Sequence, residues 1–462
     1  MYYLQYRWKL SRGRLTYYGI RGGDNLNKNV IKLSEKQEKI LSLLPCELSE
    51  RQLKAIGKLL DGGAVGTLCP KEPPESLKEA TFCKNCSAND FMIPGLQFNA
   101  QGLCPMCEHA ERTAKLKSVV PIIDDLPKSR KSRFDVAVFY TGGKDSTYLL
   151  YYLSEVKKLR VLALTWEIPY ASESAQKSIA NAKRALDKVE FVTRTVCNED
   201  MRAIYKELYR LNGNTCACPS LAYVLFYPIL VEEKVPYFVA GNEPAQLLGL
   251  YFNRFAPELA YNFSDRKGLN FLINLGRILT LRPPLKRGQF QTLMTMKQLA
   301  YGTNAIVKHS AYRNELVENV TAAIHTVPKI VKPLKKSIRR SSRSGNIPAF
   351  VQVDFDKISG GKYEWTKIKD VICEKCGWVA PEDSGKGLHT SCKIERCKEY
   401  SQFIRFYNMQ SAMIPFSAIE ISLASRDKNI TREQAIYEIE NTLGFSLTEI
   451  AECEIMREFL NK

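Results

Sequence analysis

The run Thr141-Gly142-Gly143-Lys144-Asp145-Ser146 combines two glycines with hydroxyl, ammonium and carboxylate side chains. The glycines let the backbone turn back on itself and bring N–H groups close to an anion. Lys144 and Ser146 add donors, and a helix that begins here would add the positive end of its dipole. Asp145 could orient Mg²⁺ or the loop. The run therefore predicts a phosphate-binding loop, with an ordinary glycine turn between a strand and a helix as the alternative.

The flanking residues predict the elements that position this loop. Residues 134–140 form a short apolar run typical of a buried strand, and an apolar helix follows from 147. Further strands are predicted at 160–166, 190–196 and 236–240, with helices at 172–186, 199–211 and 221–233 between them. This alternation predicts an α/β fold with a doubly wound parallel sheet.

Ligands of such sheets bind beyond the carboxyl ends of the strands, so the residues there should line one cleft. Asn242 and Glu243 follow the fourth predicted strand, where a carboxylate or amide could hold Mg²⁺ or position an acceptor. A simple capping loop is the alternative. The other residues expected at this edge are Tyr140, Thr165, Trp166, Cys197 and Gly241.

Eight of the fourteen cysteines form two sets with metal-ligand spacing. Cys83-x-x-Cys86 and Cys104-x-x-Cys107 match two zinc knuckles, and four thiolates suit tetrahedral Zn²⁺. Residues 93–98 and 99–102 between them are predicted to form the strand and turn of a zinc ribbon. Because such a site is closed, we expect a structural rather than a catalytic ion.

The second set has less regular spacing. It comprises Cys373, Cys376, Cys392 and Cys397, and His389 is a competing ligand. We expect a second structural zinc ion here, which would make two per chain. The alternative is that Cys392 faces the active site.

A third cysteine motif, Cys216-Ala217-Cys218, lies just before the helix predicted at 221–233. A helix start lowers the pKa of a nearby thiol, so two such thiolates could carry persulfide sulfur or help to bind an iron–sulfur cluster. A cluster would need a further ligand, most simply Cys197 or Cys392. The alternative is a loop in which both residues pack as small apolar groups.

The glycine loop is neither a Walker loop, which requires Gly-x-x-x-x-Gly-Lys-Ser/Thr, nor a dinucleotide fingerprint. It resembles the Ser-Gly-Gly-x-Asp-Ser pyrophosphate loop (PP-loop) of the N-type ATP pyrophosphatases, with Thr141 in place of the usual serine. Members of that superfamily cleave ATP between the α and β phosphates and transfer AMP to a carbonyl oxygen. A nitrogen or sulfur nucleophile then displaces the AMP. The resemblance implies ATP and Mg²⁺ as cofactors.

Further segments resemble the N-acetyl sugar amidotransferase branch of this superfamily, over roughly residues 80–450. They are Pro94-Gly95, Gly102 to Cys107, Val235-Pro236, Gly241-Asn242-Glu243 and Asn429 to Ala435. That branch makes acetamidino sugars with ammonia from a glutaminase partner. The chain departs from this pattern by an added amino-terminal module, a strong positive charge and Cys216-Ala217-Cys218, which is similar to motifs of sulfur-inserting members such as the tRNA 2-thiolation enzymes.

The resemblance therefore implies an AMP-forming transferase. We favour replacement of an amide or amide-like carbonyl oxygen by sulfur, with Lys144, Asp145, Cys216 and Cys218 as catalytic residues and a carrier protein, a peptide or tRNA as acceptor. The alternative is amidotransfer to a sugar. A nucleotide-sensing or nucleic-acid-binding protein without catalysis is a third hypothesis. A sulfur donor or a glutaminase is the expected partner protein.

Charge and composition constrain the partners. The 462 residues carry a net charge of +18, which indicates an acidic macromolecular partner or, alternatively, a compositional bias. Residues 329–343 hold seven cations and no acid, and their prolines and serines predict a mobile basic linker or lid. No run approaches the ~18 apolar residues of a membrane span, so we expect a cytoplasmic enzyme without membrane contact.

These features predict four parts of the chain. Residues 1–80 form a small α+β module, winged-helix-like, peptide-docking or simply an extension, in which capping boxes at Ser34 and Ser49 begin two helices. Residues 81–115 form the zinc ribbon and residues 134–330 the ATP pyrophosphatase domain. Residues 331–462 comprise the basic linker, the second cysteine set and carboxyl-terminal helices, with capping boxes at Thr431 and Ser446.

Overall fold

Five parallel strands form the sheet that carries the glycine loop. They are β6 (Val136–Phe139), β7 (Val161–Trp166), β8 (Glu190–Arg194), β9 (Tyr237–Ala240) and β10 (Ala349–Phe350), in the spatial order β10-β9-β6-β7-β8. All four neighbouring pairs are parallel. The chain starts at the central strand β6, builds one half of the sheet, and returns to the other side of β6 with β9. This is the doubly wound fold that the sequence predicted, and its topological switch point lies between β6 and β9.

The computed structural model describes residues 1–26, 29–212, 216–256, 258–261, 267–303, 314–382, 388, 391–448 and 453–461. The chain divides into two units. One comprises Met1–Thr113 and Tyr400–Ile450, and the other comprises Ala114–Glu399 and Ala451–Lys462. The sheet belongs to the second, larger unit.

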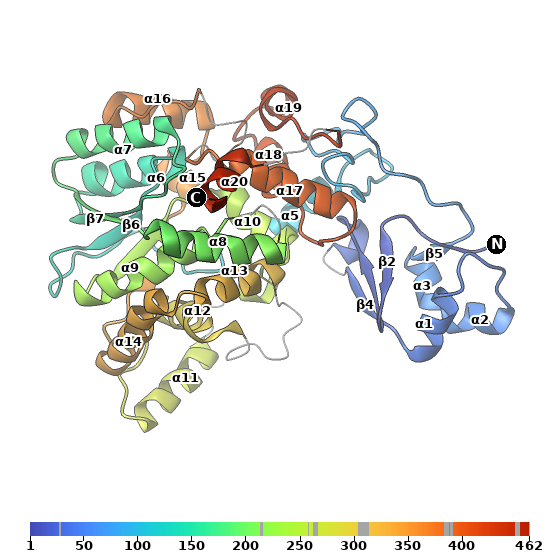
Figure 1. Ribbon diagram of the computed structural model, residues 1–462, viewed down its shortest axis with the longest axis horizontal. Helices are drawn as coiled ribbons and strands as arrows, with labels where there is room; N and C mark the ends of the chain where they lie inside the picture. Colours follow the sequence, from blue (N-terminus) through green and yellow to red (C-terminus); the bar gives the residue numbers. More distant parts are fainter. Residues whose placement is uncertain are drawn as a thin grey trace. The chain divides into compact units, whose positions relative to one another are not determined.

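Helices cover both faces of the sheet (Figure 1). On one face lie α6 (Lys144–Tyr151), α7 (Glu173–Ala185) and α16 (Trp365–Cys376), and on the other α9 (Ser220–Glu232), which packs on Phe134, Leu162 and Phe238. The remaining helices of this unit are α8 (Asn198–Asn212), α10 (Pro244–Phe252), α11 (Lys267–Leu279), α12 (Gln289–Tyr301), α13 (Glu315–His325), α14 (Pro328–Ser344), α15 (Phe355–Ile358) and α20 (Glu454–Asn461). Helix α17 (Glu395–Tyr407) crosses the boundary between the units in the sequence.

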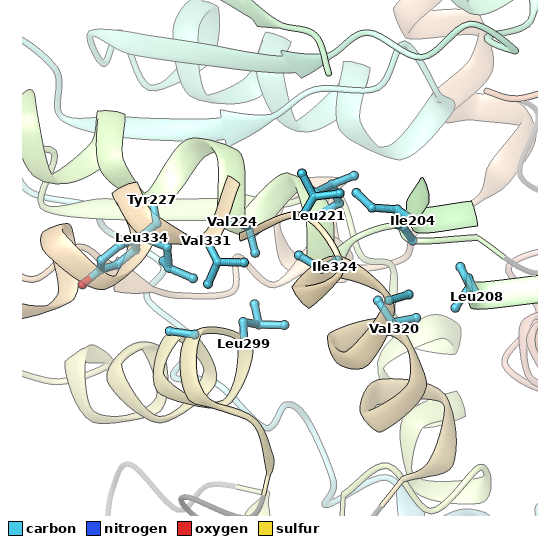
Figure 2. Packing of buried hydrophobic residues seen from close by; sticks show 14 of the residues in the cluster. Ile204, Leu208, Leu221, Val224, Tyr227, Leu299, Val320, Ile324, Val331 and Leu334 are labelled. Atoms are coloured by element: carbon cyan, nitrogen blue, oxygen red, sulfur yellow. The ribbon is translucent and has the colours of Figure 1, made fainter. Parts of the chain in front are cut away.

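The basic segment at 329–343 is not a linker, and that prediction was wrong. It forms α14, in which Val331, Leu334 and Ile338 recur at helical spacing and are buried. Figure 2 shows Val331 and Leu334 packed with side chains of α9, α12 and α13. Pro328 occupies the first turn, where it is tolerated, and Pro333 is exposed and removes one helix hydrogen bond. The buried apolar stripe outweighs that loss.

The amino-terminal unit contains a three-stranded antiparallel sheet of β2 (Trp8–Ser11), β3 (Arg14–Tyr17) and β4 (Val30–Lys32). The pair β1 (Tyr3–Leu4) and β5 (Val65–Gly66) lies apart from it. Capping boxes at Ser34, Ser49 and Thr431 are formed as predicted, whereas Glu449 of the box at Ser446 lies outside the described residues. The helices of this unit are α1 (Glu35–Leu41), α2 (Glu50–Ala55), α3 (Gly57–Asp61), α4 (Pro105–Glu108), α5 (Ala110–Thr113), α18 (Phe416–Arg426) and α19 (Arg432–Glu438).

The strand predicted at 93–98 is not formed. These residues make turns, with one bridge between Leu96 and Ile20. Gly95 explains this, because its φ of +82° turns the chain and its Cα packs against the backbone of Gly19. The first knuckle therefore lies on bends, and the second lies at the start of α4, with Cys104 as the N-cap and Cys107 in the first turn.

The packing of α14 predicts a clear difference between two variants. Leu334→Ala removes a fully buried side chain and should lower the free energy of unfolding by about 2–5 kcal/mol. Lys336→Ala changes an exposed position of the same helix and should alter it by no more than about 0.5 kcal/mol. Urea denaturation followed by circular dichroism measures both. Equal midpoints for the two variants would mean that the segment does not pack.

Candidate active site

The glycine loop lies at the carboxyl end of β6 and leads directly into α6. Gly142 has a φ of +75°, and a Cβ there would lie 2.6 Å from the carbonyl oxygen of Ala175 on α7. Gly143 is the N-cap of α6, so the loop ends where the first N–H groups of the helix are available to an anion. Trp378 fixes the loop from outside by donating its Nε1–H to the carbonyl oxygen of Gly142 at 3.1 Å.

The neighbouring strand approaches this loop backbone to backbone. Gly241, directly after β9, lies so close to the first turn of α6 that a Cβ would stand 2.5 Å from the amide nitrogen of Ser146. Any side chain at this position would push β9 and α6 apart. The sequence predicted Gly241 at this edge, and the structure gives the physical reason for a glycine there.

Lys144 lies in a cage of two carboxylates and two aromatic rings. Its Nζ bonds to Asp145 Oδ1 and lies 3.5 Å from Glu243 Oε2. The same ammonium lies 4.6 Å from the ring centre of Tyr363 and 4.9 Å from that of Trp365. Exposed fractions of 14% for Lys144, 13% for Asp145 and 1% for Glu243 place this charge cluster largely out of water.

The aromatic residues also fix the carboxylates. Tyr363 donates its hydroxyl to Asp145 Oδ1 at 2.5 Å, and Trp365 donates its Nε1–H to Glu243 Oε2 at 2.6 Å. Burial, with the negative charges of Asp145 and Glu243, raises the pKa of Tyr363 well above its usual value. The phenol therefore stays a donor. Sequence reasoning missed both aromatic residues, because their only signal was an alternating aromatic pair after Gly360-Gly361.

The other residues predicted to contact the nucleotide differ in whether they are accessible to a ligand. Tyr140 is buried and donates to the carbonyl oxygen of Ser178 at 3.3 Å, so its side chain supports the loop from beneath. Thr141 is exposed, and its Oγ1 lies 3.2 Å from Ser146 Oγ. The backbone oxygen of Asn242 accepts from Gln352 Nε2 at 2.8 Å.

Two buried polar atoms lie at the end of β7. Thr165 Oγ1 and Trp166 Nε1 have no hydrogen-bond partner within the described part of the chain. They point to opposite faces of the sheet, since Trp166 packs with Leu162 and Leu164 on the α9 side and neighbouring strand residues alternate. The glycine loop and Lys144 are the donor set that fits ATP. The loop and Lys144 would hold its phosphates, and Asp145 and Glu243 could hold Mg²⁺.

The pair Cys216 and Cys218 lies at the same edge of the sheet. The segment after β7 places Tyr170 against Tyr205, whose hydroxyl accepts from the amide of Ala217 at 3.4 Å. Helix α9 leads into β9, so α9 begins at the carboxyl edge of the sheet. Cys218 lies two residues before that start. Cys216 is half-buried and Cys218 is exposed.

The two thiols act on each other. A hydrogen bond from Cys218 lowers the pKa of Cys216 to about 6, and the ammonium of Lys398 contributes in the same direction. The same interaction raises the pKa of Cys218 well above that of an ordinary thiol. Lys398 is itself held by Glu399, whose Oε1 lies 3.1 Å from its Nζ.

Cys392 lies near enough to this pair for the charge of Cys216 to act on it, and its place in the active site stays a prediction. It bridges Ala171 in antiparallel register, and the following amide, of Lys393, donates to the carbonyl oxygen of Tyr170 at 2.8 Å. Burial first, and then the charges of Glu395 and Cys216, raise the pKa of Cys392 to about 12. Cys197 lies at the start of α8 and is exposed.

In the amino-terminal unit, the first cysteine set converges as predicted. The sulfurs of Cys83, Cys86, Cys104 and Cys107 all lie within 4.8 Å of one another. Cys83 and Cys107 are 3.8 Å apart, and Cys86 and Cys104 are 3.7 Å apart. A tetrahedron with Zn–S bonds of about 2.3 Å has edges of about 3.8 Å, so the four thiols fit Zn²⁺. Arg432 of α19 donates to the carbonyl oxygens of Cys83 at 3.0 Å and Cys86 at 3.1 Å.

The second cysteine set is not brought together. Among the described residues, only the first set gathers as a metal-binding group. Cys373 donates its thiol to the carbonyl oxygen of Trp378 at 3.3 Å. Cys397 forms a side-chain hydrogen bond with Cys453 instead. The members of the predicted set were Cys373, Cys376, Cys392 and Cys397, with His389, which lies outside the described residues, as a competitor.

No family model and no curated protein matches this chain. Among solved structures, it is similar to the U34-tRNA thiolase NcsA from Methanococcus maripaludis with its 4Fe–4S cluster, at 18% identity and a TM-score of 0.22. The match covers 58% of this chain and 88% of that one. A TM-score this low carries no argument about activity.

The cysteine positions predict one zinc ion per chain rather than two. Metal analysis by inductively coupled plasma mass spectrometry should find about one Zn²⁺ in the purified protein. Cys83→Ser should remove it and reduce folding, because zinc binding is part of the folding free energy. Cys373→Ser is the matched control and should leave the zinc content unchanged. Two zinc ions, one of them lost in Cys373→Ser, would restore the second site.

Proposed function

We propose that this protein is an ATP-dependent, AMP-forming transferase that replaces a carbonyl oxygen of an amide or amide-like acceptor with sulfur. The proposal rests on one observation, that the glycine loop and the cysteine pair lie at the same edge of the sheet. The glycine loop lies at the switch point of the sheet, and the Cys216–Cys218 pair lies along the same edge. The sequence resemblance to the PP-loop superfamily supports the same reaction class.

The first step would be adenylation. The acceptor oxygen attacks the α-phosphorus of ATP, and the bond between the α and β phosphates breaks as pyrophosphate leaves. Charge then develops on the leaving group, where the loop amides and Lys144 can stabilise it. In the protein itself Lys144 is neutralised by Asp145 and Glu243. Asp145 and Glu243 could hold a Mg²⁺ ion that accompanies ATP, which would leave the ammonium of Lys144 available to the phosphates.

The second step would be sulfur transfer. A donor protein loads Cys216 as a persulfide, and its terminal sulfur attacks the activated carbon while AMP leaves with the former carbonyl oxygen. Cys218 then attacks Cys216 Sγ, breaks the S–S bond and releases the thiocarbonyl product. This leaves a Cys216–Cys218 disulfide, which a dithiol reductant must reduce before the next turnover.

The acceptor is proposed from charge alone. A carrier protein, an acidic peptide or tRNA would each complement a net charge of +18. The amino-terminal module, whose sheet and helices form their own core, is a candidate docking element for such an acceptor.

The adenylation step predicts the products and the variants that lose them. With Mg²⁺ and acceptor, ATP should yield AMP and pyrophosphate, measured by anion-exchange chromatography. Lys144→Ala should reduce the rate by about 10²-fold or more, because it removes a donor to the developing charge. Gly241→Ala should do the same by forcing α6 away from β9. Lys367→Ala, on an exposed part of α16, is the control. ADP and phosphate as products would refute the assignment.

The sulfur step predicts an unusual pH dependence of alkylation at Cys216. With a pKa of about 6, the thiolate should be half-formed near that pH, so its reaction with iodoacetamide should level off by about pH 7. Cys218→Ala removes the hydrogen bond and should shift the half-point upward, toward the ~8.5 of a free thiol. Peptide mass spectrometry measures this, with exposed Cys69 as an internal reference.

The Cys216→Ser/Cys218→Ser double variant then separates sulfur transfer from amidotransfer. It should still form AMP in the presence of acceptor, yet incorporate no sulfur. If the double variant makes product at the wild-type rate with ammonia as the nucleophile, the amidotransferase alternative is the better account. The cysteine pair would then be loop packing.

A further inference from the structure

Helix α11 is amphipathic, but it is oriented opposite to an ordinary surface helix, whose apolar side faces the protein. Two of its polar side chains face the protein. Asn274 exchanges two hydrogen bonds with the backbone of Leu285, at 2.7 and 3.2 Å. Arg277 donates to the carbonyl oxygens of Pro283 at 2.7 Å and Ser342 at 2.9 Å. These contacts hold the helix by its polar face.

The apolar face is consequently turned outward. Its residues recur at three-, four- and seven-residue spacing, which places them on one side of a helix. Figure 1 shows α11 projecting from the rest of its unit beyond α14. Their exposed fractions are 67% for Phe271, 63% for Leu272, 44% for Leu275, 56% for Ile278 and 76% for Leu279, and Leu281 just beyond the helix is 95% exposed. A contiguous patch of this kind marks an interaction site.

The surroundings of this patch are strongly basic. The described residues 267–303 and 314–353 contain thirteen Lys or Arg and two acidic residues, a net charge of +11 out of the +18 of the chain. Arg282 and Lys286 directly follow the apolar face and are exposed. Helix α14, which the Arg277–Ser342 contact ties to α11, adds exposed cations at Lys332, Lys336, Arg339, Arg340 and Arg343.

Apolar and cationic groups together restrict the partner. Nucleic acid would satisfy the cations but offers no apolar layer for leucine and isoleucine side chains. A second copy would bring one basic surface against another. An anionic phospholipid surface accepts both, because acyl chains receive the apolar face and phosphates receive the cations.

We propose that α11, together with the basic surface of α14, docks this protein peripherally on anionic phospholipid membranes. Within the described ranges no helix is long and apolar enough to cross a membrane, so the contact is one of surface insertion. The proposal replaces the expectation of no membrane contact. It assigns the basic surface of α14 to lipid phosphates rather than to the acceptor, and it does not depend on the proposed reaction.

Flotation of the purified chain with lipid vesicles tests the proposal. The protein should float with vesicles containing about 30% phosphatidylglycerol in phosphatidylcholine, and at least about 10-fold less with phosphatidylcholine alone. Raising the salt from about 0.1 M to about 1 M should weaken binding by screening the cations. The Phe271→Ser/Leu275→Ser/Leu279→Ser variant should lose at least about 10-fold in binding, because it removes the inserted side chains.

Matched variants make the result specific. Leu43→Ser/Leu68→Ser changes exposed leucines of the other unit and should bind like the wild type. Arg339→Gln/Arg340→Gln/Arg343→Gln should bind less and show a weaker salt dependence than the wild type. The proposal is overturned if the wild type ignores anionic vesicles, or if the triple serine variant binds them equally well. A change from dimer to monomer in light scattering, without vesicle binding, would assign the patch to a second copy. Retention of tRNA without vesicle binding would assign the cations to RNA.

Discussion

The candidate active site depends on one constraint, the close backbone approach at the point where the sheet reverses its strand order. Gly142 and Gly241 clamp the start of α6 between α7 and the end of β9, and a Cβ at either position would lie within 2.6 Å of a backbone atom. This packing fixes the helix start in the crevice where ligands of doubly wound folds bind. The position of Lys144 and of Glu243 follows from it, since each stands within three residues of one of these glycines.

The charged side chains beside the glycine loop indicate a site in which Lys144 and the two carboxylates can exchange their present contacts for contacts with a ligand. A lysine and two carboxylates lie mostly out of water, which is costly unless every charge is compensated. Tyr363 and Trp365 provide that compensation through one hydrogen bond to each carboxylate and through their ring faces toward Lys144. A purely structural ion pair would not need a glycine loop beside it. An incoming phosphate and its metal ion could replace these contacts one for one.

The sequence predicted the parts of this site that depend on local signals. The four longer strands, the glycine loop and the first cysteine set follow from contiguous apolar runs, from glycine and from knuckle spacing. Tyr363 and Trp365 could not be found, because they reach the loop from more than 200 residues away without a motif. The helix at α14 was missed because two prolines and many cations obscured its apolar period. Spacing also failed for Cys373-x-x-Cys376, which ends α16, because the fold brings no second cysteine pair to it within the described residues, whereas Cys104-x-x-Cys107 at the start of α4 is brought to Cys83-x-x-Cys86.

The cysteine pair shows how the pKa of a thiol, that of Cys216, can be low without strongly positive surroundings. Around Lys398 lie the carboxylates of Glu395 and Glu399, so these groups give Cys216 no net positive charge. Its low pKa therefore rests mainly on the hydrogen bond from Cys218. Two sulfurs that share one proton behave as a unit, in which one is the nucleophile while the other remains a thiol. Persulfide transfer needs these two states in sequence, first a thiolate to accept sulfur and then a second thiol to release it. In the proposed reaction, Cys216 and Cys218 would provide both.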